Sequence, residues 1–473
     1  MRTEPERAYF LGVGGTATGN LAVALARAGW TVGGSDDRVY PPMSGLLDAA
    51  GISVDAPGDV GALGRWAGAL FVVGNAVSRG HPQVEELLKR PGERRISLPG
   101  FFGERILAAT ANLVVAGTHG KSTTAAAAAR VLRSTGAPVG WFVGGVLADG
   151  GPALSFSGED RFFVIEGDEY DSAFFDKRAK FVHYRPRVLL LNNLEFDHAD
   201  IYRDTVDVQR AFRQAIALVP GDGCILYNGD DGRLREILPV AWTRCLSFGE
   251  GAGCDFVLSR PAPGRIEIES RVEDVPGATV LASLPGAFNA RNLAGAVLGA
   301  RLLAPDLAAE RTVDLSAFAG LKRRQEILFR DDRRVLVEDF GHHPTALAAT
   351  IAAFRESYPG WTVHAMVEPR SNTLRTNRLR GELVEALAGA DRVTLAPVHR
   401  AGKLAESERL DPAAVAEVLS GRGVPSRSCG EMEEIPDAFG EGLEAGERVV
   451  TLLFSNGDFG GWIPRLRRLV AEG

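Results

Sequence analysis

Segment 113–132 constrains the fold more than any other, because an apolar strand, a glycine turn and a helix follow one another there. Apolar residues lead into Gly-Thr-His-Gly-Lys-Ser at 117–122, and an alanine-rich helical stretch follows at 125–132. Such a turn gathers backbone N–H groups around an anion at a helix N-terminus. In nucleotide-binding loops of this kind, the lysine (here Lys121) lies on the β- and γ-phosphates and the hydroxyl (here Ser122) binds Mg²⁺. The segment predicts a nucleotide site, with an ordinary helix N-terminus as the alternative.

Size, charge and cysteine content narrow the class of protein. A chain of 473 residues can form about three domains, each with its own core. A net charge of −7 disfavours a nucleic-acid surface, and the four cysteines form no metal-type pair. No apolar stretch approaches the ~20 residues of a membrane span. We therefore expect a cytoplasmic globular protein, a monomer or weak homo-oligomer, that binds neither nucleic acid nor membrane.

Strands and helices alternate in three blocks, which begin with the apolar strand and glycine turn at 9–15, near residue 108, and near residue 322. This spacing predicts parallel sheets with helices packed on them in all three blocks, an α/β fold. We expect domains at 1–107, 108–321 and 322–473. The Gly/Pro/Arg-rich stretch at 259–264 predicts a loop or hairpin connection.

The glycine turn of the first block resembles a dinucleotide-binding fingerprint. Gly12 and Gly14 have the right spacing, and Asp36, about twenty positions further on, is placed to accept from a ribose hydroxyl. Ala17 replaces the third glycine. The pattern does not separate NAD from other nucleotides, and the glycines can equally make only a tight strand-to-helix turn.

Two apolar strands of the second block end in polar residues. Glu166 ends the strand at 161–166, and Asp197-His198 follow the strand at 187–191. Carboxyl ends of parallel strands line the ligand crevice, so a carboxylate and an imidazole there can hold a second divalent cation. Oxygen ligands suit Mg²⁺, whereas imidazole is less usual for it. Surface acids and a loop histidine remain the alternative.

Charged residues also surround the start of the third block. Arg323-Arg324 can stabilise charge on a transferring phosphoryl group, and Asp339 can accept from ribose hydroxyls. A charged linker with an exposed acid is the alternative. His342-His343 suggest a metal site, but no third ligand lies at a helical spacing nearby, which disfavours it.

Together these segments resemble those of the Mur ligases, the ATP-dependent amide-forming enzymes of peptidoglycan metabolism. Segment 117–123 is similar to the family's ATP loop, and segments 166–169 and 193–198 are similar to its cation site. Segment 285–292 is similar to its adenine-contacting motif, and segments 322–324 and 339–344 are similar to its domain junctions. Phe288 replaces the usual histidine of the adenine motif. No lysine occurs between Lys180 and Lys322, so the carbamylated lysine of several Mur ligases has no counterpart.

The resemblance implies a Rossmann-like first domain that binds a UDP-sugar, a central P-loop ATPase-like domain, and a Rossmann-like third domain that binds a peptide. It implies ATP and Mg²⁺ as cofactors. Catalytic roles fall on Lys121, Glu166, His198 and Arg324. ATP contacts fall on Gly117, Thr118, Gly120, Lys121, Ser122, Thr123, Asn289, Asn292, Arg324 and Asp339. Mg²⁺ ligands are Ser122, Glu166 and His198. Substrate contacts fall on Gly14, Gly15, Ser35, Asp36, His119, His342, Arg370 and Asn372.

Longer strings are similar to one branch of the family, which joins UDP-N-acetylmuramate to L-alanyl-γ-D-glutamyl-meso-diaminopimelate when cell-wall fragments are recycled. These strings are 34–44, 169–178, 180–184, 368–373 and 455–461. The nearest alternative is a ligase that adds free L-alanine to the same acceptor. Two others are a catalytically silent nucleotide-binding regulator and an NAD-dependent dehydrogenase.

Overall fold

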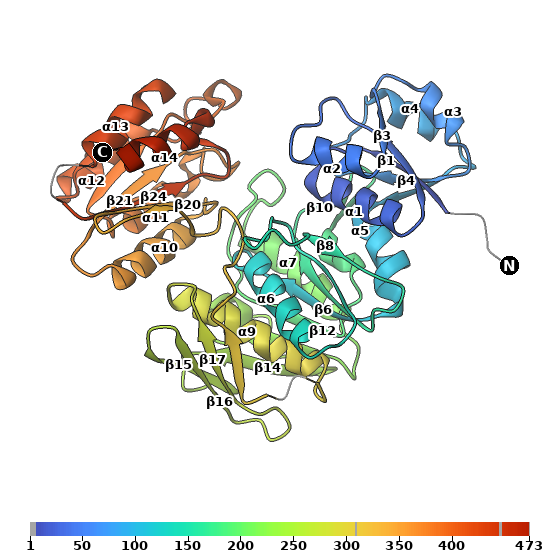
Figure 1. Ribbon diagram of the computed structural model, residues 1–473, viewed down its shortest axis with the longest axis horizontal. Helices are drawn as coiled ribbons and strands as arrows, with labels where there is room; N and C mark the ends of the chain where they lie inside the picture. Colours follow the sequence, from blue (N-terminus) through green and yellow to red (C-terminus); the bar gives the residue numbers. More distant parts are fainter. Residues whose placement is uncertain (1–5, 308–309, 444–446, 473) are drawn as a thin grey trace. The chain divides into compact units, whose positions relative to one another are not determined.

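The structure, a computed structural model, describes residues 6–307, 310–443 and 447–472 in three α/β domains, each built on a largely parallel sheet (Figure 1). This confirms the predicted fold class. The predicted domain ends at 1 and 473 lie outside the described residues, and the boundaries at 107/108 and 321/322 stay predictions. The chain forms two compact units. One unit holds the first two sheets, and the other holds the third sheet with segments 196–204 and 282–291.

The first sheet is entirely parallel, with strand order β3-β2-β1-β4-β5. Its strands are β1 (Arg7–Leu11), β2 (Thr31–Ser35), β3 (Ser53–Asp55), β4 (Leu70–Val73) and β5 (Arg94–Ser97). Its helices are α1 (Thr16–Arg27), α2 (Met43–Ala49), α3 (Gly61–Arg65), α4 (Pro82–Leu88) and α5 (Leu98–Phe101). The order reverses at β1, so the glycine turn that follows β1 lies at the topological switch point, where such folds bind ligands.

The central sheet has the order β18-β17-β16-β15-β14-β13-β12-β6-β9-β7-β8. Its strands are β6 (Ala111–Ala116), β7 (Val139–Phe142), β8 (Leu154–Ser155), β9 (Phe162–Gly167), β12 (Val188–Leu191), β13 (Cys224–Asn228), β14 (Arg244–Gly249), β15 (Phe256–Ala262), β16 (Arg265–Ser270), β17 (Ala278–Ala282) and β18 (Thr312–Leu315). Strands β10 (Asp171–Ala173) and β11 (Asp176–Ala179) form a separate hairpin. The helices are α6 (Lys121–Ser134), α7 (Thr205–Ala217), α8 (Gly232–Arg235) and α9 (Ala287–Leu303).

Part of this sheet is antiparallel beside the predicted parallel strands. Strand β16 runs antiparallel to its neighbours β15 and β17, and β8 runs antiparallel to β7. The predicted connection at 259–264 is the end of β15 and a two-residue turn before β16. So short a connection joins antiparallel strands, because a parallel crossover needs a dozen or more residues.

The third sheet has the order β19-β20-β24-β21-β22-β23 and is parallel except for β19. Its strands are β19 (Glu326–Arg330), β20 (Arg334–Asp339), β21 (Thr362–Val367), β22 (Arg392–Leu395), β23 (Ser426–Ser428) and β24 (Val449–Phe454). One face is covered by α10 (Pro344–Ser357), α11 (Arg380–Leu387) and α12 (Pro412–Gly421), and the other by α13 (Ile435–Glu441) and α14 (Ile463–Glu472) (Figure 1).

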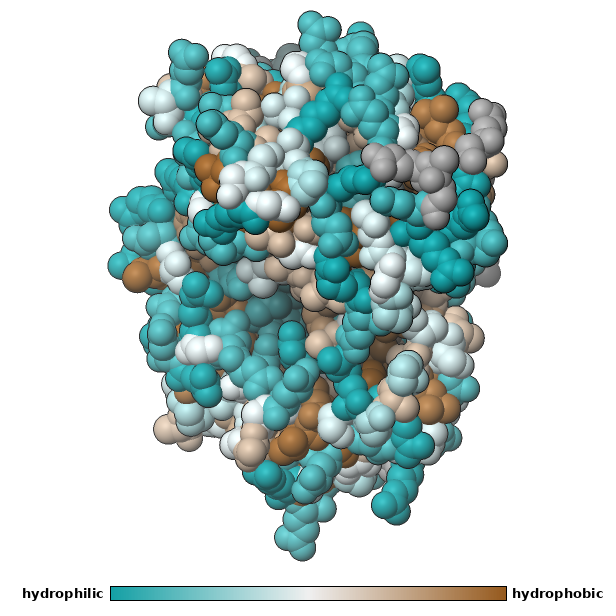
Figure 2. Space-filling view, turned by 90° about the vertical axis from the view of Figure 1, so that its left-hand side faces the viewer, coloured by the Kyte–Doolittle hydropathy of each residue, from teal (hydrophilic) through white to brown (hydrophobic). Residues whose placement is uncertain are grey.

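Apolar residues are gathered inside the domains rather than on one broad surface. On the face drawn in Figure 2, hydrophobic residues occur in small groups among hydrophilic ones. Among the described residues, no helix is long and apolar enough to cross a membrane. The predicted cytoplasmic location stays a prediction.

A buried histidine in the third sheet makes this domain sensitive to pH. His364 lies on β21 with 2% of its surface exposed, and its Nε2 is 2.9 Å from Oγ1 of Thr394 on β22. Its buried Nδ1 has no hydrogen-bond partner in the structure. Burial lowers the pKa of His364 to about 4.

We expect the protein to lose stability as the pH falls from 6.5 towards 4. The folded-state pKa lies below the ordinary value of 6.5, so only the unfolded chain takes up this proton in that window. At the acid end the loss approaches about 3 kcal/mol. His364→Gln should flatten the pH dependence of the urea unfolding midpoint between pH 6.5 and 4. An equal slope in both proteins would contradict this account.

Candidate functional site

The turn between β6 and α6 has the geometry of an anion-binding loop. Gly117 and Gly120 adopt left-handed backbone conformations, with φ of 138° and 79°. Helix α6 begins at Lys121, directly after Gly120. A side chain on Gly120 would clash with Oδ1 of Asn292, so the loop needs glycine there for both its backbone conformation and its space. The backbone N–H groups of the first turn of α6 lie where the sequence predicts an anion site, which stays a prediction.

Lys121 is a buried cation held by acidic residues. It is 9% exposed, and its Nζ donates to the Gly117 carbonyl at 2.7 Å and to Oε2 of Glu169 at 2.8 Å. Burial opposes the charge, but the carboxylates of Glu169, Asp168 and Glu166 outweigh it and raise the pKa of Lys121. The lysine is therefore charged at neutral pH. Glu169, 2% exposed, was not among the predicted site residues.

Glu166 lies at the end of the strand beside the loop. Strands β6 and β9 are parallel neighbours, and Glu166 is opposite Val115, two residues before Gly117. One of its carboxylate oxygens accepts from the backbone N–H of Gly144 at 2.7 Å. Ser122, 6% exposed, is the second residue of α6. A hydroxyl and a carboxylate suit Mg²⁺, so the residues present fit the predicted ion.

A second loop, Asn192–Glu195 after β12, binds the first. Oδ1 of Asn193 accepts from the backbone N–H of His119 at 2.8 Å, and Nε2 of His119 is 3.1 Å from Oε2 of Glu195. Nδ2 of Asn192 donates to Oγ1 of Thr124 on α6 at 3.1 Å. Sequence reasoning missed these asparagine contacts, because their partners lie about seventy residues away in the chain.

In the first domain, the acid predicted to contact ribose is bonded to the glycine turn. Oδ2 of Asp36 accepts from the backbone N–H of Gly14 at 2.8 Å, while Gly15 donates to the Gly12 carbonyl at 3.3 Å. Ser35 is 1% exposed, and its hydroxyl donates to Gln83 at 2.5 Å. The Ser35 side chain is thus buried against Gln83, and its predicted substrate contact stays a prediction.

The second compact unit brings the Asp-His pair next to His342. Asp197 is 4% exposed, and its Oδ2 is 3.3 Å from Nε2 of His342. Its Oδ1 accepts from Oγ1 of Thr373 and from the backbone N–H of His198, both at 2.7 Å. Burial raises the pKa of Asp197, but His342, His198 and Thr373 together lower it below the ordinary value, so the carboxylate is ionised. His198 itself has a left-handed backbone, with φ of 56°.

Asp339 belongs to a buried polar chain in the same unit. It is 2% exposed, and its carboxylate accepts from the Gly341 N–H at 2.5 Å and from Thr350 at 3.2 Å. Gln325 donates to Asp339 and accepts from Asn289 at 3.1 Å. Burial raises the pKa of Asp339, against the charge of Arg324 and these donors. A ribose hydroxyl would have to compete with donors that the carboxylate already has.

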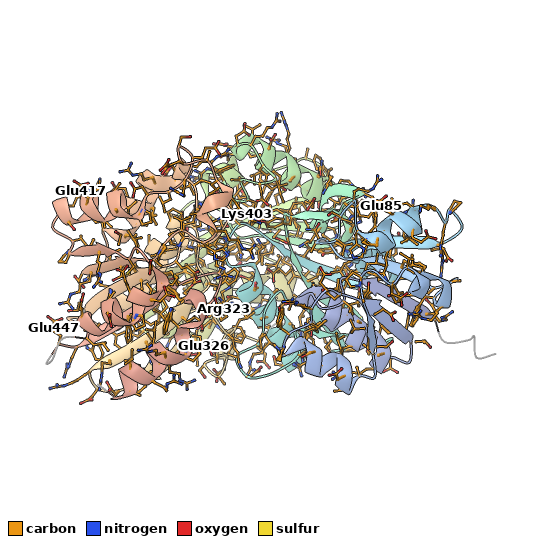
Figure 3. The ribbon with its side chains drawn as sticks, turned by 90° about the horizontal axis from the view of Figure 1, so that it is seen from above. Glu85, Arg323, Glu326, Lys403, Glu417 and Glu447 are labelled. Carbon is orange, nitrogen blue, oxygen red and sulfur yellow. The ribbon has the colours of Figure 1, made fainter. Side chains whose placement is uncertain are left out.

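The arginines at the start of the third domain pack on one ring. The guanidinium carbons of Arg323 and Arg324 lie 5.3 and 4.7 Å from the centre of the Phe340 ring. Arg323 also bonds Glu338 at 2.7 Å, and its backbone N–H donates to Glu326 at 2.8 Å; Figure 3 labels Arg323 and Glu326. Arg323 is therefore held at the start of the third sheet, and Arg324 stacks beside it.

Arg370 lies in the loop after β21, between two carboxylates. Its guanidinium is 3.2 Å from Glu368, which is 3% exposed, and 3.3 Å from the exposed Asp458. Asn372 accepts from Arg375 at 2.7 Å. Glu368 also accepts from the backbone N–H of Phe459 at 3.1 Å, so it fixes Arg370 against the loop after β24. Sequence reasoning missed Glu368 as a site residue.

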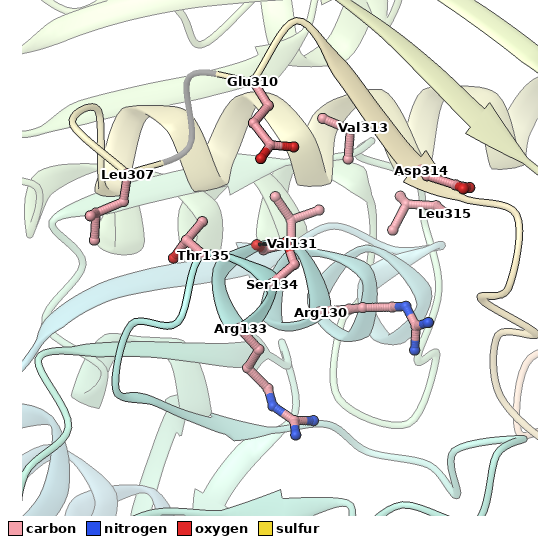
Figure 4. Close-up of a pocket in the computed structure, with 10 residues that line it drawn as sticks. All are labelled: Arg130, Val131, Arg133, Ser134, Thr135, Leu307, Glu310, Val313, Asp314 and Leu315. Atoms are coloured by element: carbon pink, nitrogen blue, oxygen red, sulfur yellow. Dashed lines mark hydrogen bonds between the residues drawn. The ribbon is translucent and has the colours of Figure 1, made fainter.

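A pocket of about 470 Å³ in the first unit lies away from the phosphate-type loop (Figure 4). It is lined by Arg130 and Arg133 near the end of α6 and by Leu307, Glu310 and Asp314. The loop is at the other end of this 14-residue helix, roughly 20 Å away. This pocket is therefore not the predicted nucleotide site.

Comparison with known proteins identifies relatives along the whole chain. Three family models match: "Mur ligase family, catalytic domain" over 7–103, "Mur ligase middle domain" over 115–300, and "Mur ligase, glutamate ligase domain" over 323–453. The UDP-N-acetylmuramate–L-alanyl-γ-D-glutamyl-meso-2,6-diaminoheptandioate ligase of Escherichia coli (strain K12) is 37% identical over 460 residues, 96% of each chain.

Two further relatives bear on the substrate. The crystal structure of a murein peptide ligase from Psychrobacter arcticus 273-4 has a TM-score of 0.68 and 30% identity over 99% of each chain. A UDP-N-acetylmuramate–L-alanine ligase of Leuconostoc citreum (strain KM20) is 32% identical over 405 residues, 82% of this chain and 83% of that protein.

The glycines at the two ends of α6 allow a matched test of the loop. Gly120 and Gly136 share a left-handed backbone, with φ of 79° and 78°, but only Gly120 has side chains packed against it. Alanine at either position should cost about 1 kcal/mol for the backbone, and Gly120→Ala about 1–3 kcal/mol more for the clash with Asn292. Urea unfolding midpoints of both variants measure the difference. Equal losses of stability in the two variants would show that the loop can shift to accommodate a side chain at position 120.

Proposed function

The chain belongs to the Mur ligase family, and from this premise we propose that it joins UDP-N-acetylmuramate to L-alanyl-γ-D-glutamyl-meso-diaminopimelate, with ATP as the energy source. The observation that carries the proposal is Lys121, buried at the start of α6 with its Nζ bonded to Glu169, in the loop predicted to bind phosphate. The full-length similarity to a ligase named for this reaction supports the choice of substrates.

In the proposed reaction the muramoyl carboxylate attacks the γ-phosphate in line, which gives an acyl phosphate and ADP. Lys121 and the N–H groups of α6 hold the phosphates and neutralise charge that develops during the transfer. The α-amine of the tripeptide then attacks the acyl carbon, and phosphate leaves as the amide forms. The substrates exchange groups directly, without a covalent bond to the protein.

Magnesium is the implied cofactor of the phosphoryl transfer. Ser122 and Glu166 would hold it in the central domain, and we assign His198 as a further ligand. When bound, the ion offsets the repulsion between the substrate carboxylate and the triphosphate. The buried Asp197 fixes the backbone of His198 through its N–H and thereby orients the loop that carries the imidazole.

Each remaining site residue receives a substrate or a nucleotide contact. We assign the UDP-sugar to the first domain, at Gly14, Gly15 and Asp36 at the switch point of its sheet. Adenosine contacts fall on Asn289, Asn292, Arg324 and Asp339. His119 and His342 are assigned to the muramoyl group, and Arg370 and Asn372 to the peptide. The third domain would close over the site and keep water from the acyl phosphate.

The tripeptide is preferred to free L-alanine for a physical reason. Arg370 carries a planar guanidinium that can grip a carboxylate in two places, and a tripeptide brings several carboxylates to the third domain. Free alanine has one carboxylate and buries far less surface. ADP release with UDP-N-acetylmuramate plus L-alanine, dipeptide, tripeptide or tetrapeptide in turn tests the whole proposal.

Lys121→Ala should lower kcat at least ~100-fold, because it removes a preorganised charge from the phosphates. Lys89→Ala is the control, since Lys89 is exposed on the first domain, where it pairs with Glu86. ADP release and the thermal unfolding midpoint are measured for both variants. Normal turnover in a folded Lys121→Ala protein would exclude the phosphate-loop assignment.

The wild-type protein should use the tripeptide with a kcat/KM at least ~100-fold above that for L-alanine, about 2.7 kcal/mol of transition-state binding. Arg370→Ala should narrow this ratio mainly by impairing the tripeptide reaction. Arg422→Ala, on the exposed end of α12 where Arg422 pairs with Glu385, should leave it unchanged. A wild-type preference for free L-alanine would assign the protein to the other branch.

A further inference from the structure

Three loops meet at one edge of the central sheet. Strands β6, β12 and β13 are parallel neighbours, and Ala116, Leu191 and Tyr227 are opposite one another at their carboxyl ends. The loops that follow must therefore leave the sheet side by side. The first is the phosphate loop, the second is Asn192–Glu195, and the third runs from Asn228 to Asp231 at the start of α8.

The second loop fixes the backbone of the phosphate loop. The Thr118 N–H donates to the Asn193 carbonyl at 3.3 Å, and the Glu195 N–H donates to Oγ1 of Thr118 at 2.8 Å. The His119 N–H also donates to Oδ1 of Asn193. These contacts hold Thr118 and His119, the two residues that precede Gly120 and Lys121. The conformation of the phosphate loop therefore depends on where residues 193–195 lie.

Asp231 in turn holds the second loop from its far side. Oδ1 of Asp231 caps α8 by accepting from the Leu234 N–H at 2.9 Å, and Oδ2 accepts from the Leu194 N–H at 3.0 Å. Leu194 is fully buried, so a lost acceptor would leave its N–H without water as a replacement. Leu194 lies between Asn193 and Glu195, the two residues that bind the phosphate loop.

We propose that Asp231 is a positioning residue for nucleotide binding, which acts through Leu194 on the phosphate loop. This rests on the proposed function, in which that loop binds ATP. The position needs a carboxylate because two separate N–H groups require two acceptors. An asparagine can cap α8 equally well with its one oxygen, but it then presents an NH₂ donor to the Leu194 N–H.

The neighbouring Asp230 provides a matched control. Its two oxygens also accept from backbone N–H groups, those of Glu250 at 2.7 Å and Gly251 at 2.9 Å. These donors belong to the turn between β14 and β15, away from residues 193–195. Asp230→Asn and Asp231→Asn thus make the same chemical change at adjacent positions, but only Asp231→Asn removes an acceptor from the loop at 192–195.

Asp231→Asn should weaken ADP binding, measured by calorimetry, and lower kcat/KM for ATP at least ~10-fold, about 1.4 kcal/mol. Affinity for UDP-N-acetylmuramate should stay near wild type even though the unpaired Leu194 N–H lowers the unfolding midpoint, and Asp230→Asn should leave ADP affinity unchanged. Unaltered ADP affinity in Asp231→Asn would overturn the proposal. So would equal losses of affinity for ADP and for UDP-N-acetylmuramate together with a lowered unfolding midpoint. Wild-type protein that fails to bind ADP would instead refute the proposed function.

A double-mutant cycle tests the route of the effect. Asn193→Ala removes the next step of the same chain, so its loss in ADP affinity and that of Asp231→Asn should not add in the double variant. Additive losses would overturn the route through Leu194. Asp231→Ser, which keeps the cap on α8 but is too short to reach Leu194, should reproduce the asparagine result even if the latter variant folds poorly.

Discussion

The central domain depends on the burial of one positive charge. An ammonium group removed from water is stable only when nearby carboxylates replace its hydration, and Glu169, Asp168 and Glu166 do this for Lys121. The same three acids belong to one short segment at the end of β9. The parallel pairing of β6 and β9 brings this segment beside the turn after β6, and the ion pairs with Lys121 join the two. A candidate Mg²⁺ ligand, Glu166, therefore lies beside the helix N-terminus that is proposed to bind phosphate. A triphosphate entering this loop would compete with Glu169 for the ammonium.

Local pattern alone predicts the part of the site that is local in sequence. The turn at 117–122 and the position of Glu166 follow from an apolar run and the residues that end it, and the structure has both where they are expected. The partners of the turn are different, because Glu169 and Asn193 reach it by contacts across 48 and 74 residues. Asp231 reaches Leu194, in the neighbouring loop, across 37 residues. No periodic pattern in the sequence reveals contacts of this kind. At 259–264 the sequence left a loop and a hairpin open, and the structure has the hairpin, with β15 and β16 antiparallel.

Burial decides two further cases in which residue type was an incomplete guide. Ser35 and Asp339 are polar residues at the carboxyl ends of strands, where ligand contacts are expected. Each also has a buried partner in its own domain, Gln83 for the serine and Gln325 for the aspartate. Each glutamine lies outside the strand that carries its partner, and neither belongs to a recognisable sequence motif. A strand-end position therefore indicates which edge of a sheet carries function, but not which side chains at that edge face outward.

The width of the central sheet has a consequence for association between chains. Eleven strands in one sheet leave two edges whose unpaired backbone groups can template strands from another molecule. One edge ends in β8, which has only two residues, and the other in β18, which has four and carries Asp314. Strands this short offer too few aligned N–H and C=O groups for a foreign strand to extend the ladder. The sheet can therefore be wide without becoming a nucleus for amyloid-like growth.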